Sequence, residues 1–418
     1  MKEFIIVGCG LAGITTALEL LRRGHRVTLF DAAKSEGLGA SYANGGMLTP
    51  SMSDPWNAPG VYRHMLASLV DPHAALKLNL AALPSLLSWG PRFLLNSGRG
   101  RFVAATNANF DLACYSLPVL ASLMREFDLS FDESSRGTMK LFRTQQALDA
   151  SMAASAALRA RGLIAEPLDP AGAVSVEPCL APIRASFAGA IYYPRDGSGD
   201  AHKFCASAAA VVRQLGGVFR FGAPVSEIVI EGGAAAGVRC GQNIVRAANV
   251  VIATGVDSPK LAATAGIRLH VKPVKGYSIT YDLDPALRGP RIPVVDDALH
   301  AAVTPLGRRL RVAGTAELAG QDLRLDQRRL DNIARMARTL FPDIFGSEML
   351  AGGRPWTGLR PVAADGRPYV GRAKEGLWIN AGHGHLGWTL AAGSARLLAD
   401  LAEGRPPEID PAPFAVGR

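Results

Sequence analysis

The sequence predicts an α/β fold (α+β overall) that combines a part built on parallel strands with a part built on an antiparallel sheet. Two observations predict it. Residues 4–31 show a strand–helix–strand pattern, and both strands are short apolar runs typical of parallel sheets buried on both faces. Residues 217–255 are short strand-like runs linked by Gly turns, which favours antiparallel pairing, and further strand-like runs lie between residues 271 and 313. With 418 residues, of which 48% are hydrophobic, the chain is long enough for two or three domains.

The elements follow in chain order. A strand is expected at Phe4–Val7, a helix at Leu11–Arg23 and a second strand at Val27–Phe30, while Pro55–Phe131 is expected to be helical. The runs between residues 217 and 255, beginning with VFRF, predict an antiparallel meander that leads into one buried strand. Further strands are expected at residues 134–143, 187–193, 271–282, 292–295, 301–304, 309–313 and 377–380, and further helices at 145–161, 201–215, 326–340 and 389–402.

A glycine-rich turn joins the first strand to the first helix. It has the spacing Gly8-x-Gly10-x-x-Gly13, and Asp31 ends the next strand eighteen residues after Gly13. Glycines let backbone approach a pyrophosphate, and the helix N-terminus offers N–H groups and a partial positive charge. An acid at Asp31 can accept a hydrogen bond from a ribose hydroxyl and disfavours a 2′-phosphate. The sequence therefore predicts a dinucleotide site that disfavours NADP.

Three further segments favour FAD over NAD as the dinucleotide. One ends the buried strand after the meander, one follows the first strand–helix–strand unit, and one lies between the last strand and the last helix, where N–H groups can face a reduced flavin. The residues expected to contact the cofactor are Gly8, Gly10, Gly13, Asp31, Ser41, Asn44, Gly45, Gly46, Ala253, Thr254, Gly255, Gly382, Gly384, Leu386, Gly387, Trp388 and Thr389.

Composition excludes several other classes of protein. The net charge of +9 is spread along the chain with no basic run, so nucleic-acid binding is not expected. Five cysteines without a C-x-x-C motif indicate reduced thiols in the cytoplasm and no metal site. The most apolar later stretch, Leu78–Leu95, contains Asn79, two prolines and Arg92, and is not expected to span a membrane.

Four more segments carry a resemblance to a known family. They are Pro273–Tyr277, Val312–Thr315, the sequence GLRP at Gly358–Pro361, and Asn380–Thr389 with its GHGxLGWT pattern, and Ser41–Gly46 carries the same resemblance. With them the chain resembles the D-amino-acid dehydrogenase branch of the D-amino-acid oxidase, glycine oxidase and sarcosine oxidase superfamily, over nearly its whole length. The resemblance implies a Rossmann-like FAD-binding domain of the glutathione-reductase type, interleaved with an antiparallel-sheet substrate domain. It implies FAD-binding segments at residues 1–62, 197–268 and 350–418, and substrate-binding segments at residues 63–196 and 269–349.

The resemblance also implies roles for individual residues. Arg360 of GLRP corresponds to the arginine that pairs with the substrate carboxylate, a structural salt bridge being the alternative. Lys275 is expected near the flavin, or else as a solvated strand lysine. His383, with His385, flanks the expected flavin edge, unless these imidazoles only satisfy a local turn. For the second carboxylate partner, a tyrosine in glycine oxidases, the substitutes are Tyr277 and His300; the backbone of Val225 is expected to meet the adenine.

The activity implied by the resemblance belongs to amino-acid catabolism. It is oxidation of a D-amino acid, with D-proline and hydroxyproline as candidates, by hydride transfer to noncovalently bound FAD. Noncovalent FAD is expected because no cysteine follows Cys240. A quinone or another acceptor takes the electrons, and the basic charge suggests peripheral contact with a membrane. The alternatives are an oxidase that uses oxygen, a flavin-bearing subunit of a larger complex and an NAD-dependent dehydrogenase; the oligomeric state stays open.

Overall fold

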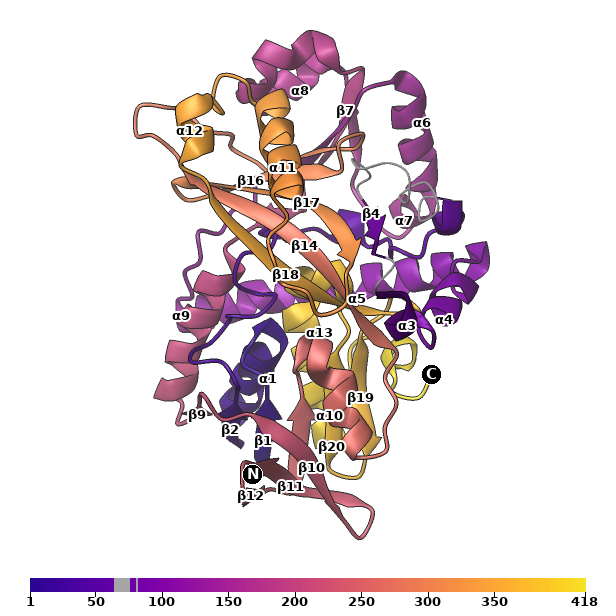
Figure 1. The fold of residues 1–418 in the computed structure, drawn as a ribbon, viewed down its shortest axis with the longest axis vertical. Coiled ribbons are helices and arrows are strands. Elements are labelled where there is room, and N and C mark those ends of the chain that lie inside the picture. The colour runs from indigo at the N-terminus through magenta and orange to yellow at the C-terminus, as the bar shows by residue number, and fades with distance from the viewer. Residues whose placement is uncertain (64–75, 80–81) are drawn as a thin grey trace.

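The computed structural model describes residues 1–63, 76–79 and 82–418, arranged as two halves that meet along the middle of the molecule (Figure 1). The lower half is built on a parallel sheet with the strand order β19-β20-β13-β1-β2-β9, in which only β19 runs antiparallel to its neighbour. Its strands are β1 (Glu3–Val7), β2 (Arg26–Phe30), β9 (Val218–Arg220), β13 (Asn249–Ile252), β19 (Tyr369–Lys374) and β20 (Leu377–Ala381).

Both faces of this sheet are buried by packing elements. Successive side chains of β1 point to opposite faces, so they show what covers each one. Phe4 and Ile6 pack against helices, whereas Ile5 and Val7 pack under a smaller antiparallel sheet and a short helix. The helices on the first side are α1 (Leu11–Arg22), α9 (Ala201–Gln214), α13 (Gly387–Glu403) and α5 (Arg99–Phe127). The elements on the second side are β10 (Val225–Glu231), β11 (Ala234–Cys240), β12 (Asn243–Arg246) and α10 (Ser258–Thr264).

The upper half is built on a larger, mainly antiparallel sheet with the order β18-β14-β17-β16-β15-β5-β7-β6, and β4 pairs with β17. Helix α11 (Gln327–Leu340) packs on it through Ile333 and Leu340, which share a core with Val303 and Val312. The strands are β4 (Leu76–Leu78), β5 (Thr138–Phe142), β6 (Glu166–Leu168), β7 (Gly189–Tyr193), β14 (Val271–Asp282), β15 (Val294–Asp296), β16 (Ala301–Leu306), β17 (Arg309–Leu318) and β18 (Arg354–Ala363).

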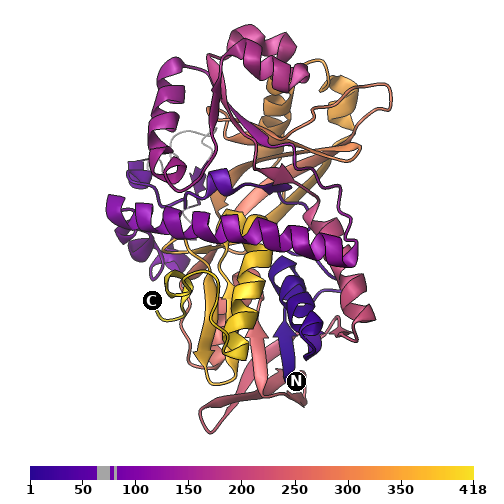
Figure 2. The ribbon, with the colours of Figure 1, turned by 180° about the vertical axis from the view of Figure 1, so that it is seen from behind.

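Helix α5 crosses the back of the molecule along the seam between the halves (Figure 2). It lies directly on α13, because Gly393 has no side chain at the contact: a Cβ there would be 2.9 Å from the Cβ of Ser116. The Gly393 N–H also donates to Ser116 Oγ at 2.9 Å.

The remaining elements are β3 (Met47–Leu48), β8 (Gly197–Ser198), α3 (Leu83–Leu86), α4 (Gly90–Leu95), α6 (Gln145–Ala154), α7 (Ala156–Arg159), α8 (Pro170–Val176), α12 (Ser347–Ala351) and the 3-10 turns η1 (Pro50–Met52), η3 (Pro178–Ser186), η4 (Gly255–Asp257), η5 (Gly384–Leu386) and η6 (Ala412–Phe414).

The expected mixture of parallel and antiparallel sheets is confirmed, while several local features differ from the expectations. Strand β9 pairs with β2 instead of opening the meander. Strand β4 interrupts the stretch expected to be helical, of which residues 64–75 and 80–81 lie outside the described residues. Residues 145–161 form two helices, α6 and α7. Strand β18 was not among the expected strands; it contains Pro355 and Pro361, and both are tolerated because it is an edge strand of the sheet.

In the part of the chain that the structure describes, no helix combines the length and the hydropathy needed to cross a bilayer.

Candidate active site

A cavity of about 1890 Å³ lies between the two halves and is lined by residues of both sheets. Most of the cofactor and substrate residues expected from the sequence line this cavity. Those that line it are Gly8, Gly10, Asp31, Ser41, Asn44, Gly45, Gly46, Val225, Ala253, Thr254, Gly255, His300, Arg360, His383, Gly384, Gly387 and Trp388.

The glycine-rich turn between β1 and α1 forms one wall of this cavity. Gly8 has a φ of 108°, and a Cβ there would lie 2.4 Å from the carbonyl oxygen of Ala253. A Cβ at Gly13 would lie 1.8 Å from the Gly8 carbonyl oxygen, so this glycine lets the helix pack closely on the strand although it does not line the cavity. The first turn of α1 carries no acidic residue, and Ser41 Oγ accepts a hydrogen bond from Leu11 N at 3.1 Å. This positive helix end fits an anionic pyrophosphate.

Asp31 at the end of β2 also accepts two backbone hydrogen bonds, which its position in the sequence did not predict. Its Oδ2 accepts from Cys9 N at 2.6 Å, and its Oδ1 accepts from Ala33 N at 2.8 Å. The carboxylate therefore fixes the glycine-rich turn to the end of β2. An ionised carboxylate has about four acceptor positions, so two remain for the ribose hydroxyls expected here. The residues of this wall thus fit the adenosine and pyrophosphate of FAD.

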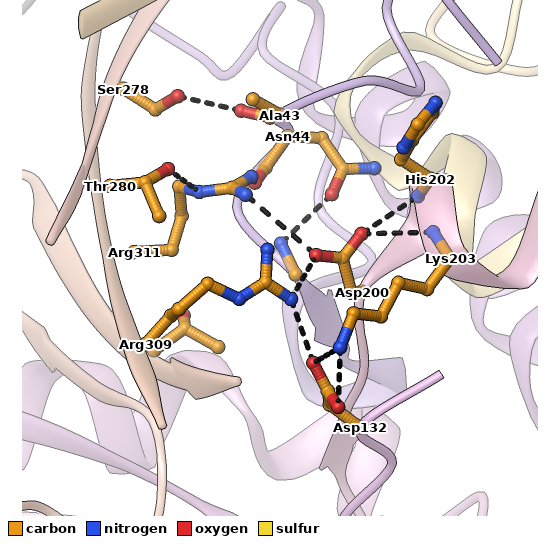
Figure 3. A network of polar contacts seen from close by, with 12 residues as sticks. Ala43, Asn44, Asp132, Asp200, His202, Lys203, Ser278, Thr280, Arg309 and Arg311 are labelled. Atoms are coloured by element: carbon orange, nitrogen blue, oxygen red, sulfur yellow. Dashed lines mark hydrogen bonds and ion pairs between the residues drawn. The ribbon is translucent and has the colours of Figure 1, made fainter. Parts of the chain in front are cut away.

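The segment at residues 43–45 is held by the larger sheet (Figure 3). Ser278 on β14 donates to the carbonyl of residue 43 at 2.7 Å. Arg311 on β17 donates to the carbonyl of residue 44 at 2.8 Å, and Thr304 on β16 donates to the carbonyl of residue 45 at 2.7 Å. Three adjacent strands of one half thus position three consecutive peptides of the other half, of which residues 44 and 45 line the cavity.

Charged side chains extend this connection between the halves (Figure 3). Asp200 caps α9 by accepting from the backbone N–H groups of residues 202 and 203. Its other oxygen accepts from Arg309 at 2.8 Å, and Arg309 also pairs with Asp132 at 2.7 Å. Arg311 lies 3.9 Å from Asp200, and burial lowers the pKa of Arg311 to about 10. The seam is therefore joined by polar contacts close to the cavity.

Arg360 brings a positive charge into the cavity from β18. Its guanidinium passes over Gly276, where a Cβ would be only 1.9 Å from its Nη1. The same nitrogen lies 3.5 Å from the Thr315 carbonyl oxygen, and the guanidinium is 5.4 Å from the ring centre of Trp56. Within residues 1–63, 76–79 and 82–418, no carboxylate forms an ion pair with it. Burial lowers the pKa of Arg360 to about 10, so the side chain stays protonated at neutral pH and can bind an anionic ligand.

Two imidazoles follow β20 and remain uncharged at neutral pH. Burial lowers the pKa of both His383 and His385 to about 4. His383 Nε2 lies 3.1 Å from Ser394 Oγ, and His385 Nε2 lies 3.3 Å from the Met52 carbonyl. His385 also stacks on Trp56 at 5.2 Å. The sequence had indicated His385 through its place in the GHGH loop, whereas nothing in the sequence had indicated Trp56.

Lys275 and Tyr277 do not line the cavity, although the sequence suggested roles for both. Side chains alternate along β14: Val274 lines the cavity, and Gly276, on the same side of the strand, lies under the Arg360 guanidinium. Lys275 therefore points to the other side, where its Nζ donates to the carbonyl of Arg324. The Tyr277 hydroxyl donates to a Glu317 carboxylate oxygen at 3.0 Å inside the core under α11.

The other expected residues lie at the edge of the cavity or just behind it. His300 lines it and is exposed, with a φ of 48°. Thr389 accepts from Thr49 N at 3.0 Å and so supports the chain after Gly46 from outside the lining. Gly382 and Leu386 also lie outside the lining and shape the turn that presents their neighbours.

Comparisons with known proteins agree with this geometry. The DAO family, described as FAD dependent oxidoreductase, matches residues 3–401. A D-amino acid dehydrogenase of Cereibacter sphaeroides is 41% identical, with 100% of this chain and 95% of that protein covered. A D-amino acid dehydrogenase of Paramagnetospirillum magneticum is 37% identical, with 97% and 96% covered.

Solved structures show the same fold over the whole length. Glycine oxidase of Geobacillus kaustophilus superposes with a TM-score of 0.76 at 26% identity, covering 100% of this chain and 99% of that one. L-proline dehydrogenase of P. horikoshii has a TM-score of 0.75 at 18% identity, with 97% and 94% covered, and supports the fold alone. The cavity, the glycine-rich turn and these matches together show that the chain belongs to the DAO family of FAD dependent oxidoreductases.

Proposed function

We propose that this protein is an FAD-dependent D-amino-acid dehydrogenase. The observation that carries the proposal is the protonated Arg360 guanidinium, which opens onto the same cavity as the dinucleotide turn and pairs with no carboxylate of the described residues. A planar guanidinium binds a carboxylate through two parallel hydrogen bonds. The relatives at about 40% identity that carry the name D-amino acid dehydrogenase support the same substrate class.

The residues of the site bind and orient the substrate more than they exchange protons with it. FAD, when bound, supplies the acceptor for the hydride that leaves the substrate Cα. Arg360 holds the carboxylate, and the neutral imidazoles of His383 and His385 add no second cation that would change the orientation of the ligand. The neutral amine of the substrate provides its lone pair as the hydride leaves, so the step requires no side-chain base. Alignment of this kind accounts for a large rate enhancement.

The product is an imino acid that water converts to a 2-oxo acid and ammonia. A cyclic substrate such as D-proline or a hydroxyproline gives a cyclic imine instead. We propose that FAD is bound without a covalent link, so that acid precipitation releases it into the supernatant. We propose a quinone as the electron acceptor, and the rival acceptor is oxygen.

A surface of α4 and the start of α5 supports peripheral contact with an anionic membrane. Leu87 and Leu95 are 76% and 65% exposed. Arg92, Arg99 and Arg101 are exposed beside them, and residues 82–110 contain no acidic side chain. Apolar side chains interleaved with arginines are typical of surfaces that bind anionic lipid. We call residues 87–101 the basic apolar face.

Anaerobic titration of the purified flavoprotein tests the proposed function. We expect D-amino acids to bleach its visible absorbance, while L-amino acids, glycine and sarcosine bleach it far more slowly. A quinone dye should then restore the colour without peroxide. Rapid reoxidation by oxygen with peroxide release would make the protein an oxidase. A yellow protein that no amine bleaches would instead favour a flavin-bearing subunit.

A further inference from the structure

Strand β17 carries a bulge beside Arg360. Residues 275–277 of β14 lie opposite residues 314–317 of β17, so that Gly276 faces both Thr315 and Ala316. A bulge of this kind redirects side chains next to functional sites. Because Gly276 has no side chain, the guanidinium of Arg360 reaches across β14 to the bulge.

The backbone of the bulge is strained at one residue. Thr315 has a φ of 59°, in the left-handed region that a branched Cβ disfavours. Such strain persists only where the surroundings enforce it, and it clusters at ligand-binding sites. Here the conformation brings the Thr315 carbonyl oxygen to 3.5 Å from Arg360 Nη1 and makes Thr315 part of the cavity lining.

The Thr315 hydroxyl is buried and has no hydrogen-bond partner among the residues that the structure describes. Withdrawing a hydroxyl from water without a partner is unfavourable, so native proteins rarely leave one in that state. Thr315 lines the cavity with other atoms of the residue, so a rotation of its side chain about χ1 turns the hydroxyl toward a bound ligand, which then supplies the missing partner. The hydroxyl and the Arg360 guanidinium are then two hydrogen-bond donors at one place.

We propose that Thr315 is the second carboxylate-binding residue of the site, donating its hydroxyl hydrogen to the carboxylate that Arg360 holds. This inference rests on the proposed function. Tyr277 is unsuited to that role because its hydroxyl already donates to Glu317 outside the cavity lining. His300 is exposed, whereas the Thr315 hydroxyl is shielded from water, where a hydrogen bond to a charged group is strongest.

The test measures carboxylate binding apart from turnover. Propionate, which has the carboxylate and no amine, is titrated as an inhibitor of D-alanine-dependent flavin reduction and, without D-alanine, against the flavin spectrum. Thr315→Val keeps the branched shape and removes the hydroxyl. We expect it to raise the propionate Kd and the D-alanine Kd by about tenfold. The reduction rate at saturating D-alanine should fall by a smaller factor than the Kd rises, and Thr315→Ser should restore both Kd values.

Thr357→Val is the matched control. Its hydroxyl donates to the Gly276 carbonyl at 2.9 Å on the neighbouring strand, and Thr357 does not line the cavity. We expect this variant to bind propionate like the wild type, which separates loss of a ligand contact from loosening of the sheet. FAD content and the melting temperature confirm that each variant is folded.

The outcomes separate this inference from the proposed function. Wild-type protein that D-alanine bleaches, together with unchanged Kd values in Thr315→Val, would overturn the role of Thr315 alone. Equal weakening in Thr315→Val and Thr315→Ser would also overturn it, because the hydroxyl would not be the cause. Wild-type protein that binds no propionate overturns the inference as well. Wild-type protein that binds propionate but is bleached by no amino acid contradicts the proposed function, while the propionate Kd still tests Thr315.

Discussion

Arg360 combines a charge with a half-buried position in the cavity wall, and this combination makes its pH behaviour informative. Burial lowers the pKa of Arg360 to about 10, whereas an exposed arginine titrates above about 12. The protonated form binds a carboxylate, so binding is complete below the lowered pKa and is lost as the pH rises through it. Neither His383 nor His385 titrates in that range, because the pKa of each is near 4.

We therefore expect propionate affinity to be constant between about pH 6 and pH 9 and to fall above about pH 10. Arg360→Ala should keep FAD and weaken D-alanine binding by roughly 10- to 150-fold, which corresponds to the ~1.5–3 kcal/mol of a charge-assisted hydrogen bond. Arg360→Lys keeps a charge without the planar fork and should recover only part of the loss. Flavin spectra across the pH range measure both effects. An affinity that persists to pH 11 in the wild type would contradict the lowered pKa.

Sequence motifs identified the residues whose chemistry depends on local spacing. The glycines at 8, 10 and 13 follow from the strand–turn–helix pattern, whereas Arg360 was expected only from the family resemblance at GLRP. Thr315 and Trp56 could not be found in this way, because a bulge and a ring stack depend on how distant strands pair. The orientation of Lys275 could have been predicted from the sequence. Side chains alternate along a strand, so Lys275 and Gly276 face opposite sides of β14.

At the scale of elements, the contact between the larger sheet and residues 43–45 determines the shape of the cavity wall. Ser278 and Thr304 are neutral donors, whereas Arg311 is a buried cation that also donates to Thr280 Oγ1 at 2.6 Å. Its removal leaves the residue 44 carbonyl without this donor in a buried place, which is unfavourable. The peptide is then free to rotate toward the cavity.

We expect Arg311→Met, which has a similar length, to weaken FAD binding by about tenfold, as is usual for the loss of a buried charged donor. Arg309→Met is the matched control, because Arg309 pairs with Asp132 and Asp200 but touches no carbonyl of residues 43–45. The control should lower the melting temperature while FAD affinity stays within about twofold of the wild type. Fluorescence titration of each apoprotein with FAD gives the affinities. Equal FAD affinities in all three proteins would show that Arg311 does not position this segment.

Elements with a clear periodic pattern of apolar residues were predicted well, whereas strands that depend on pairing with a distant strand were not. The long alternating run at Val271–Asp282 is strand β14 with the same bounds. The edge strand β18 escaped prediction because prolines normally end strands, and only its place at the edge makes them acceptable. Strand β4 joins the sheet only through β17, a partner more than two hundred residues away.

At the scale of the whole molecule, the two halves are interleaved more closely than the expected domain boundaries suggest. Strand β18 pairs with β14 from Val271↔Ala363 to Thr280↔Arg354, although residues 350–418 were expected to belong with the FAD-binding part. Arg360 therefore reaches the cavity from the larger sheet. The division into domains stays a prediction, and residues after β18 return to the parallel sheet as β19 and β20.

The net charge of +9 acts on the molecule as a whole, but the basic apolar face concentrates it beside exposed leucines. Each arginine near an anionic bilayer contributes about 1 kcal/mol, and salt screens this attraction. We expect the protein to sediment with phosphatidylserine vesicles at low salt and to be released at about 0.5 M salt, as screening shortens to a few ångström. Phosphatidylcholine vesicles should not sediment it.

A pair of charge-matched variants separates this face from net charge alone. Arg99→Glu with Arg101→Glu changes the face, whereas Arg239→Glu with Arg246→Glu makes the same change in net charge on the small sheet of β11 and β12. The first variant should stay in the supernatant, while the second should sediment like the wild type. If both lose binding equally, dispersed charge accounts for the attraction; if the wild type never sediments, a quinone acceptor must reach the cavity without this surface.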